Sequence, residues 1–375
     1  MQLLGGRSAE AFLSQYWQKH PLLVRKAIPG FKGLVQAPEL LALAARDDIE
    51  SRLVSRRRGA WQLRHGPVSR ADLTRLPQKN WTLLVHGLNL VLPEADALLR
   101  RFRFLPYARL DDVMVSHAVT GGGVGPHQDS YDAFLLQGPG RRRWEISRPR
   151  PWRFDATAPL RILRGFRPEH SWVLDPGDML YLPPGWGHDG VALEPCQTYS
   201  IGFRAPSDQE LAREFLAHLQ ERIERHGSYR DPQLAPPRHA AEIPAGMVRH
   251  SAAVAAGIRW RARDVARFLG EYLTSPKPQV VFARPRRPAA PARFAALSRR
   301  RGVRLDLRTQ LLFRGADFFV NGERAVVPAR ARSALLRLAD ERALPPGPLP
   351  RALLAVLHAW YLSGWVRVGE RHERD

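Results

Sequence analysis

The middle of the chain alternates short apolar runs with turn residues. Between residues 132 and 203 each run is rich in leucine, aromatic or β-branched residues, and Gly, Pro or Asp lies close after it. This pattern is typical of strands bounded by turns. It predicts strands over residues 132–137, 141–147, 172–174, 179–182 and 197–203, the first two joined by the tight turn Gly138-Pro139-Gly140. Many short strands at close spacing favour a β-sandwich or barrel.

A helical pattern begins at residue 207. Ser207 and Glu210 have the spacing of a capping box, and apolar residues then recur on one helical face at positions 211, 215, 219 and 223. We therefore expect a helix directly after Pro206. Two more helical stretches, near 247–256 and 263–273, precede the sequence Ser275-Pro-Lys-Pro278.

The last part of the chain follows a Pro- and Arg-rich linker at 284–291. Residues 310–313 and 317–320 pattern as strands, Asn321-Gly322 is a hairpin signal, and helices are expected near 329–341 and 350–362. These patterns divide the chain into a mostly β domain (1–206), a helical domain (207–278) and a C-terminal domain of short helices with a small sheet (279–375).

The chain is strongly basic, with 58 Lys and Arg against 36 Asp and Glu and a net charge of +22. This charge favours a nucleic-acid partner, with RNA contacted through the basic surface. Arginine far outnumbers lysine, so a GC-rich coding sequence competes as an explanation for the choice of Arg. The basic clusters at 56–58 and 299–301 lack interleaved aromatic residues.

Cellular location is constrained by what the sequence lacks. The single cysteine, Cys196, excludes an intramolecular disulfide and fits a reducing compartment. We find no signal-peptide core and no run of 18 or more apolar residues, so we expect a cytoplasmic protein without membrane contact. Walker A and His-Glu-x-x-His motifs are absent, which leaves nucleotide hydrolysis and zincin chemistry without support.

Three residues have the types and spacing of a metal site. His127 and Asp129 follow a glycine-rich run, and on an extended strand both side chains point to the same side. About one His-x-acid pair is expected by chance among 13 histidines, so the pair needs His188, which follows Pro183-Pro-Gly-Trp-Gly. Two imidazoles and one carboxylate leave coordination positions open and suit ferrous iron, whereas structural zinc takes four ligands. A triad inside a small β-barrel indicates a cupin, the double-stranded β-helix.

Charge is unevenly distributed along this basic chain. Residues 110–140 and 168–203 contain no Lys or Arg but nine acids, although these 67 positions would hold about ten basic residues at the average frequency. The proposed metal ligands lie in these two tracts. We therefore expect an acidic mouth that favours a cationic target.

Several motifs together resemble those of one known family. They are Asp111-Asp-Val-Met-Val-Ser116, Gly121-Gly-Gly-Val-Gly-Pro-His-Gln-Asp-Ser-Tyr-Asp132, Gln137-Gly-Pro-Gly-Arg-Arg-Arg-Trp144 and Tyr181-Leu-Pro-Pro-Gly-Trp-Gly-His188, with Tyr16-Trp-Gln-Lys-His-Pro-Leu-Leu-Val-Arg-Lys-Ala27 near the start. The chain resembles the bacterial JmjC-type ribosomal oxygenases over residues 1–206, and more loosely beyond. This resemblance implies Fe(II)- and 2-oxoglutarate-dependent use of O2 to hydroxylate the β-carbon of an arginine in the sixteenth large-subunit ribosomal protein.

The resemblance also assigns site residues. His127, Asp129 and His188 match the iron ligands, Arg142 matches the basic residue that grips the cosubstrate carboxylate, and Ser200 would add a hydroxyl. The positions that match the substrate pocket are Asp112, Met114 and Tyr131, with Ser116 on the same strand face. Without the family, Arg142 could equally be one of three solvated charges in Arg141–Arg143, and each pocket residue could be structural.

For the rest of the chain, the resemblance implies helices that form a homodimer and a C-terminal winged-helix module. An apolar helical face would also fit intramolecular packing. Because no base-reading helix is evident, we do not expect DNA binding. Alternatives that stay open are a non-catalytic cupin that assists ribosome assembly, and a related oxygenase that hydroxylates histidine or demethylates its target.

Overall fold

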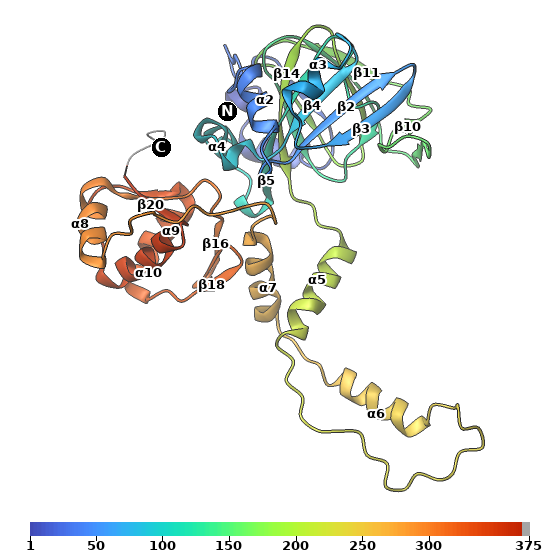
Figure 1. Ribbon diagram of the computed structural model, residues 1–375, viewed down its shortest axis with the longest axis vertical. Coiled ribbons are helices and arrows are strands. Elements are labelled where there is room, and N and C mark those ends of the chain that lie inside the picture. Colours follow the sequence, from blue (N-terminus) through green and yellow to red (C-terminus); the bar gives the residue numbers. More distant parts are fainter. Residues whose placement is uncertain (370–375) are drawn as a thin grey trace.

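The computed structural model describes residues 1–369, so the last six residues of the predicted 279–375 domain lie outside the described part. Its N-terminal half is built from two antiparallel sheets that face each other (Figure 1). The larger sheet has the order β1 (Leu22–Val24), β12 (Met179–Leu182), β7 (Ala133–Gln137), β14 (Cys196–Phe203), β5 (Leu110–Ala118), β4 (Trp81–Val85), β2 (Ser51–Arg57) and β3 (Ala60–His65). The smaller has the order β11 (His170–Leu174), β8 (Arg142–Ser147), β13 (Gly187–Ala192) and β6 (His127–Gln128).

The expected strands are present, and their order is that of a double-stranded β-helix. The turn at 138–140 carries the chain from β7 in one sheet to β8 in the other, so these consecutive strands do not pair. β9 (Arg153–Phe154) and β10 (Leu163–Arg164) form a separate ribbon between β8 and β11.

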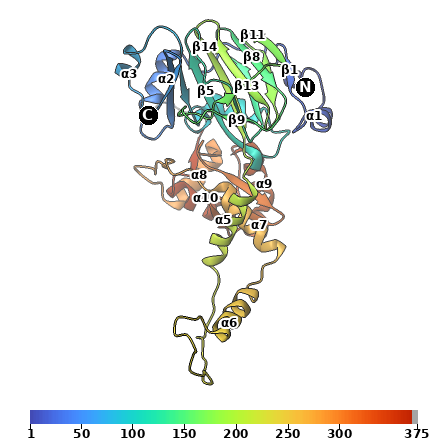
Figure 2. The ribbon, with the colours of Figure 1, turned by 90° about the vertical axis from the view of Figure 1, so that its right-hand side faces the viewer.

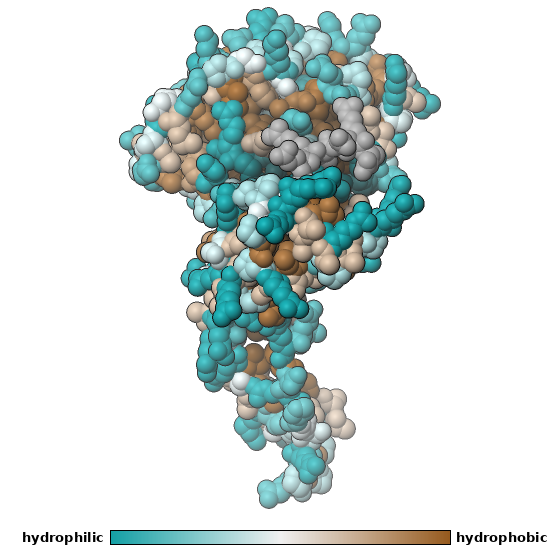
Figure 3. All heavy atoms as spheres, turned by 90° about the vertical axis from the view of Figure 1, so that its left-hand side faces the viewer, coloured by the Kyte–Doolittle hydropathy of each residue, from teal (hydrophilic) through white to brown (hydrophobic). Residues whose placement is uncertain are grey.

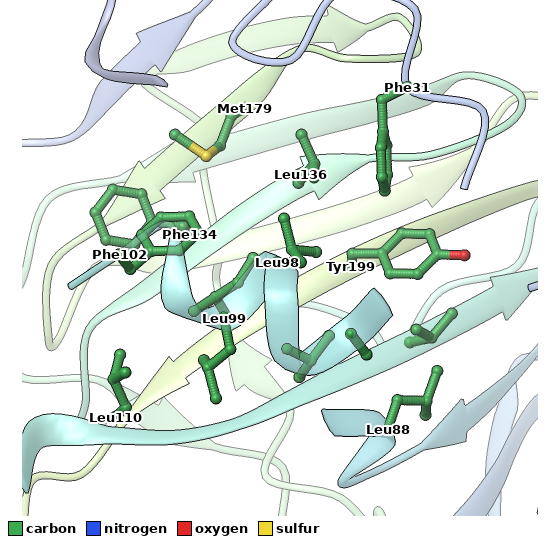
Figure 4. Close-up of a cluster of buried hydrophobic side chains, with 14 of the residues drawn as sticks. Phe31, Leu88, Leu98, Leu99, Phe102, Leu110, Phe134, Leu136, Met179 and Tyr199 are labelled. Carbon is green, nitrogen blue, oxygen red and sulfur yellow. The ribbon is translucent and has the colours of Figure 1, made fainter. Parts of the chain in front are cut away.

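Alternation along the strands divides the apolar residues between two cores. In β7, Phe134 and Leu136 point to the outer face of the large sheet, whereas Leu135 points between the sheets. The outer core is covered by the N-terminal segment, with helices α1 (Ala9–Gln15) and α2 (Ala37–Ala44), and by α4 (Pro93–Arg100). Figure 4 shows Leu98 and Leu99 of α4 beside Phe134 and Tyr199. This layer covers the face of the large sheet that points away from the smaller sheet. Helix α3 (Arg70–Thr74) follows β3.

A helical stalk follows the barrel. α5 (Asp208–Gln220) begins as predicted, because Ser207 Oγ accepts from the Glu210 backbone N–H. α6 (Ala245–Ala256) buries none of its residues and extends away from the rest of the molecule (Figures 1 and 2). α7 (Ala262–Thr274) returns and packs against α5 and the strands that follow.

The C-terminal part has its own apolar core. Helices α8 (Pro291–Arg301), α9 (Arg332–Glu341) and α10 (Arg351–Leu362) pack on β15 (Val303–Leu305), β19 (Ala343–Leu344) and β20 (Val366–Val368), and a meander contains β16 (Leu311–Arg314), β17 (Asp317–Val320) and β18 (Glu323–Ala325). Asn321 and Gly322 have φ of 48° and 88°, so both take the left-handed conformation of the predicted hairpin turn.

Polar contacts join the C-terminal part to the barrel. The Tyr107 hydroxyl donates to the Asp340 carbonyl at 2.9 Å, and the guanidinium of Arg342 lies 3.5 Å from Asp96 on α4. Arg204, just after β14, donates to the Leu273 carbonyl at the end of α7. Through residue 369, no helix has both the length and the apolar character needed to cross a membrane.

Candidate active site

The three predicted metal ligands come together between the two sheets. His127 and His188 are cross-strand partners in β6 and β13, with ring centroids 4.1 Å apart. Asp129 follows β6 directly, and its Oδ2 lies 3.7 Å from His188 Nε2. One ligand atom from each residue lies within 4.8 Å of the other two, so a single ion could contact all three.

Both histidines are held in the tautomer that a metal requires. Nδ1 of His127 lies 2.9 Å from the Gly125 carbonyl oxygen, and Nδ1 of His188 lies 3.0 Å from that of Trp186. A carbonyl oxygen only accepts, so each Nδ1 donates, and each Nε2 is the ring nitrogen left available to a metal. Burial, followed by the nearby His127 ring, lowers the pKa of His188 to about 4. Two imidazole nitrogens and one carboxylate therefore fit a divalent ion with open coordination positions.

Glycines allow the backbone to approach closely around this triad. A Cβ on Gly123 would lie 2.6 Å from the Gly190 carbonyl oxygen, and one on Gly190 would lie 2.6 Å from the Trp144 ring. The run Gly121–Gly123 thus lets the loop before His127 lie directly against the β13 backbone that carries His188.

Arg142 forms the floor of the barrel. Its side chain is buried, with 4% of the residue exposed, and it donates to Ser116 Oγ at 3.1 Å. A terminal nitrogen lies 3.7 Å from Cys196 Sγ, and Nε has no hydrogen-bond partner. Within residues 1–369, Arg142 pairs with no carboxylate, whereas its neighbours Arg141 and Arg143 pair with Glu194 and Glu145. A buried guanidinium without an acid is suited to bind an anionic ligand.

Strand β5 sets the depth of the site. Asp112, Met114 and Ser116 alternate along it and share the face that points between the sheets, as expected from their spacing. Ser200 lies opposite Met114 in the register of β14 and β5, midway between floor and mouth. Ser116 and Asp112 are four positions apart on the strand, which corresponds to about 13 Å. This length accommodates a small dicarboxylate and the end of a substrate side chain.

Asp112 and Tyr131 lie at the mouth. Asp112 Oδ2 accepts from the Gly87 N–H at 3.0 Å and lies 3.6 Å from His86 Nδ1. Burial alone would raise the pKa of Asp112, but His86, Lys277 and the Gly87 N–H hold it below its usual value, so the carboxylate is charged. Tyr131 is 40% exposed. Burial of its phenol and the charges of Asp129 and Asp112 raise its pKa, which keeps it a neutral hydrogen-bond donor.

Two family models match the chain, a JmjC domain over residues 97–211 and a ROXA-like winged helix over residues 257–367. The chain is also 35% identical to the ribosomal protein uL16 3-hydroxylase of Escherichia coli over 94% of its own length and 96% of that protein. This chain belongs to the JmjC ribosomal oxygenase family. The match confirms the predicted fold class, including the winged-helix module.

Other members of the family extend the comparison. The oxygenase is 37% identical to a probable ribosomal oxygenase of Haemophilus influenzae over 60% of this chain and 54% of that protein. The solved structure of E. coli YcfD, a ribosomal oxygenase, in complex with cobalt and 2-oxoglutarate superposes with a TM-score of 0.81 at 34% identity, covering 96% of this chain and 98% of the other.

Sequence reasoning about this oxygenase missed Lys277. Its Nζ lies 3.1 Å from Asp111 Oδ1, and it lines a small cavity of about 20 Å³ together with Asp112 and His86. Lys277 belongs to Ser275-Pro-Lys-Pro278, which is far from the barrel in sequence and carries no motif. The one feature of the sequence that could have indicated Lys277 as a site residue is that lysine is rare in this arginine-rich chain.

The acidic tracts contribute fewer charges to the mouth than their composition suggests. Arginines from elsewhere neutralise several of the acids: Arg25 pairs with Asp178 at 2.6 Å, Arg109 with Asp132 at 3.4 Å, Arg141 with Glu194 at 3.2 Å and Arg148 with Glu169 at 3.2 Å. Asp112 and Asp129 remain near the opening, and Asp111 is paired there with Lys277 at 3.1 Å. The acidic surface at the mouth is therefore small.

Proposed function

We propose that this protein is an Fe(II)- and 2-oxoglutarate-dependent hydroxylase that uses O2 to modify the β-carbon of an arginine in ribosomal protein uL16. The observation that carries the proposal is the buried Arg142, unpaired with any acid in the described residues, on the floor beneath an open His-Asp-His triad. A non-catalytic binding module would need neither the floor cation nor all three ligands. Family membership and the uL16 hydroxylase name of the E. coli relative support the same reaction.

In this proposal each group on the chain has a defined role. His127, Asp129 and His188 hold the iron, which with 2-oxoglutarate and O2 supplies the oxidation of a C–H bond to C–OH and yields succinate and CO2. Arg142 binds the distal carboxylate of 2-oxoglutarate. Ser116, which its strand face grouped with the substrate pocket in the sequence, contacts Arg142, and we assign it to orienting that guanidinium. Ser200 supplies a hydroxyl to the wall between floor and mouth.

The mouth residues select an arginine side chain. Asp112 would accept from the substrate guanidinium, Tyr131 would cover it, and Met114 would pack against its methylene stem. A charged carboxylate at this depth favours a guanidinium over a neutral imidazole, which argues against histidine hydroxylation. Demethylation would need an N-methyl group at the iron. The nitrogen that carries it would then lie at the iron and not beside Asp112.

Mass spectrometry of a uL16 peptide panel tests this function. The purified protein, Fe(II), 2-oxoglutarate and air should add one oxygen to a single arginine. His127→Ala should abolish the addition, and His226→Ala, an exposed histidine on the stalk, should not. An unmodified panel with continued 2-oxoglutarate consumption would move the substrate elsewhere, and full activity in His127→Ala would refute the metal assignment.

We also propose that the protein is a cytoplasmic homodimer, paired through residues 207–278. In its support, α6 buries no residue, and Trp260 in the loop after it is 52% exposed. Figure 3 shows hydrophobic residues at the surface of this narrow extension. A second copy would cover them. The division at residues 206 and 278 remains a proposal, and α7 packs on β16, β17 and β18 beyond the second boundary.

A further inference from the structure

One surface segment beside the active site has a composition unlike its surroundings. Residues 148–167, which we name the arginine arm, connect β8 to β11 and contain six arginines and a single acid, Asp155. At the chain's average frequency, about three arginines would be expected in 20 residues. All six are exposed, so the arm forms a dense positive surface.

The arm is attached to the loops that carry the metal ligands. The Trp152 indole N–H donates to the Gly185 carbonyl at 3.3 Å, and the Gly185 N–H donates to the Asp129 carbonyl at 2.8 Å. The Leu163 N–H donates to the Pro126 carbonyl at 2.7 Å, one residue before His127. The arm therefore forms part of the rim of the active site.

Aromatic rings alternate with the charges on this rim. The guanidinium of Arg150 lies 4.2 Å from the Trp152 ring centroid, and that of Arg161 lies 4.4 Å from the ring of Phe154. The surface continues onto the β2–β3 hairpin, which lies beside β10 in Figure 1. A Cβ on Gly125 would touch Trp61 of this hairpin at 2.6 Å and Ile162 of the arm at 2.7 Å.

The hairpin adds further positive charge. Arg56 lies 5.3 Å from the Trp61 ring centroid, and Arg57 and Arg58 at the tip are exposed. The rim therefore has the aromatic interleaving that the short run at 56–58 lacks in sequence.

Most of this charge is not neutralised by the protein. Arg148 pairs with Glu169 at 3.2 Å and Arg164 lies 3.6 Å from Asp155. Across the described chain, Arg150, Arg153, Arg161 and Arg167 form no ion pair with a carboxylate. Four exposed guanidinium groups without a carboxylate partner, two of which lie over aromatic rings, are the combination that binds an RNA backbone and its bases.

We propose that the arginine arm and the β2–β3 hairpin bind RNA, so that the enzyme takes its substrate as a protein with RNA attached. This inference rests on the proposed function, because a ribosomal protein is the target that brings RNA to this rim. The acidic mouth and the basic arm match the two components of such a substrate, the basic protein and the anionic RNA. The acidic mouth attracts a basic side chain and repels phosphate, and the surrounding arm does the reverse.

Fluorescence anisotropy with a labelled polyuridine RNA tests the surface. The triple variant Arg153→Gln, Arg161→Gln, Arg167→Gln should weaken RNA binding at least tenfold. It should also reduce the magnitude of the slope of the log association constant against the log salt concentration by about 2, since each lost phosphate contact removes about 0.7. The control Arg299→Gln, Arg300→Gln, Arg301→Gln in α8 removes equal charge far from the rim in sequence and should bind as the wild type does.

Hydroxylation assays separate this inference from the proposed function. The arm variant should hydroxylate a free uL16 peptide at the wild-type rate but lose the faster turnover expected for wild-type enzyme with a uL16–RNA complex. Absence of RNA binding by the wild type, or equal weakening in both triple variants, would overturn the inference. Absence of peptide hydroxylation in the wild type would refute the function instead and leave the binding result interpretable. If the triple variant fails to fold, Arg153→Gln alone, at a residue with no ring or acid partner, should show a smaller loss of the same kind.

Discussion

Lys277 Nζ lies 3.1 Å from Asp111 Oδ1, which joins the segment after α7 to the first strand of the active-site wall. Asp111 also lies 3.6 Å from Arg204, so one rim carboxylate contacts two cations. The segment that follows α7 thus contributes a charged group to the mouth of the barrel.

Lys277→Met should lower the KM for an arginine peptide about fivefold and leave kcat unchanged. The ammonium repels an incoming guanidinium and neutralises the carboxylates that would attract it, an effect of about 1 kcal/mol at a partly exposed site. Steady-state kinetics would measure the change, with the exposed Lys79→Met as the matched loss of charge. A raised KM would mean instead that Lys277 holds Asp111 in the binding position.

Arg142→Lys should raise the KM for 2-oxoglutarate at least tenfold. A lysine keeps the charge but cannot grip a carboxylate with two parallel bonds or reach Ser116 in the same way. The KM for the peptide should stay near the wild-type value, because the floor and mouth are separate. Arg143→Lys, one residue along and paired with Glu145, provides the control; an equal effect there would contradict the assignment.

Val248→Asp with Val254→Asp should convert the proposed dimer to a monomer. Both valines are exposed on α6, and two charges would be buried against a second copy. Light scattering after size exclusion would report the mass, and Val326→Asp, at an 88% exposed position outside the stalk, should leave it unchanged. A monomeric wild type would rule the dimer out.

His117 should make stability fall in mild acid. Burial, and then the charge of Arg142, lower the pKa of His117 below its usual 6.5. The unfolded chain therefore takes up a proton that the folded chain refuses, so stability is complete above pH 6.5 and declines below it, by up to about 1.4 kcal/mol per pH unit.

Denaturant unfolding at pH 7.5 and 5.5 tests this effect of His117. His117→Phe should lose less stability over that interval than the wild type, and the exposed His226→Phe should behave as the wild type. Parallel losses in all three proteins would show that folding does not lower the pKa of His117.

Local patterning predicted the barrel strands and the metal site, because alternation along a strand determines which side chains share a face. The same alternation decides the case of Arg141–Arg143, where the sequence left two interpretations open: the middle residue faces inward and its neighbours face out. The hairpin at Asn321-Gly322 was also predictable, since few residues other than Asn and Gly accept positive φ.

Contacts between distant segments could not be predicted in this way. Ser116 and Arg142 are 26 residues apart, and their hydrogen bond depends on how the two sheets face each other. Lys277 is 166 residues from Asp111, and no pattern in either segment indicates the other. The arginine arm was not recognised because arginine is common in much of the chain, and its position beside the site depends on the hydrogen bond from Trp152 to the loop before His188.

Strand β5 fixes the distance between the floor and the mouth of the proposed site. This strand carries both Ser116 at the floor and Asp112 at the mouth. The rise per residue of the strand therefore determines the proposed distance between the cosubstrate and the head of the substrate side chain. Under the proposed function, distance from the mouth would select the atom that is oxidised. Replacing Asp112 or Tyr131 would then change which side chain is bound, while Arg142 and the metal ligands would keep the same reaction. The substrate preference of this barrel is thus separable from its reactivity.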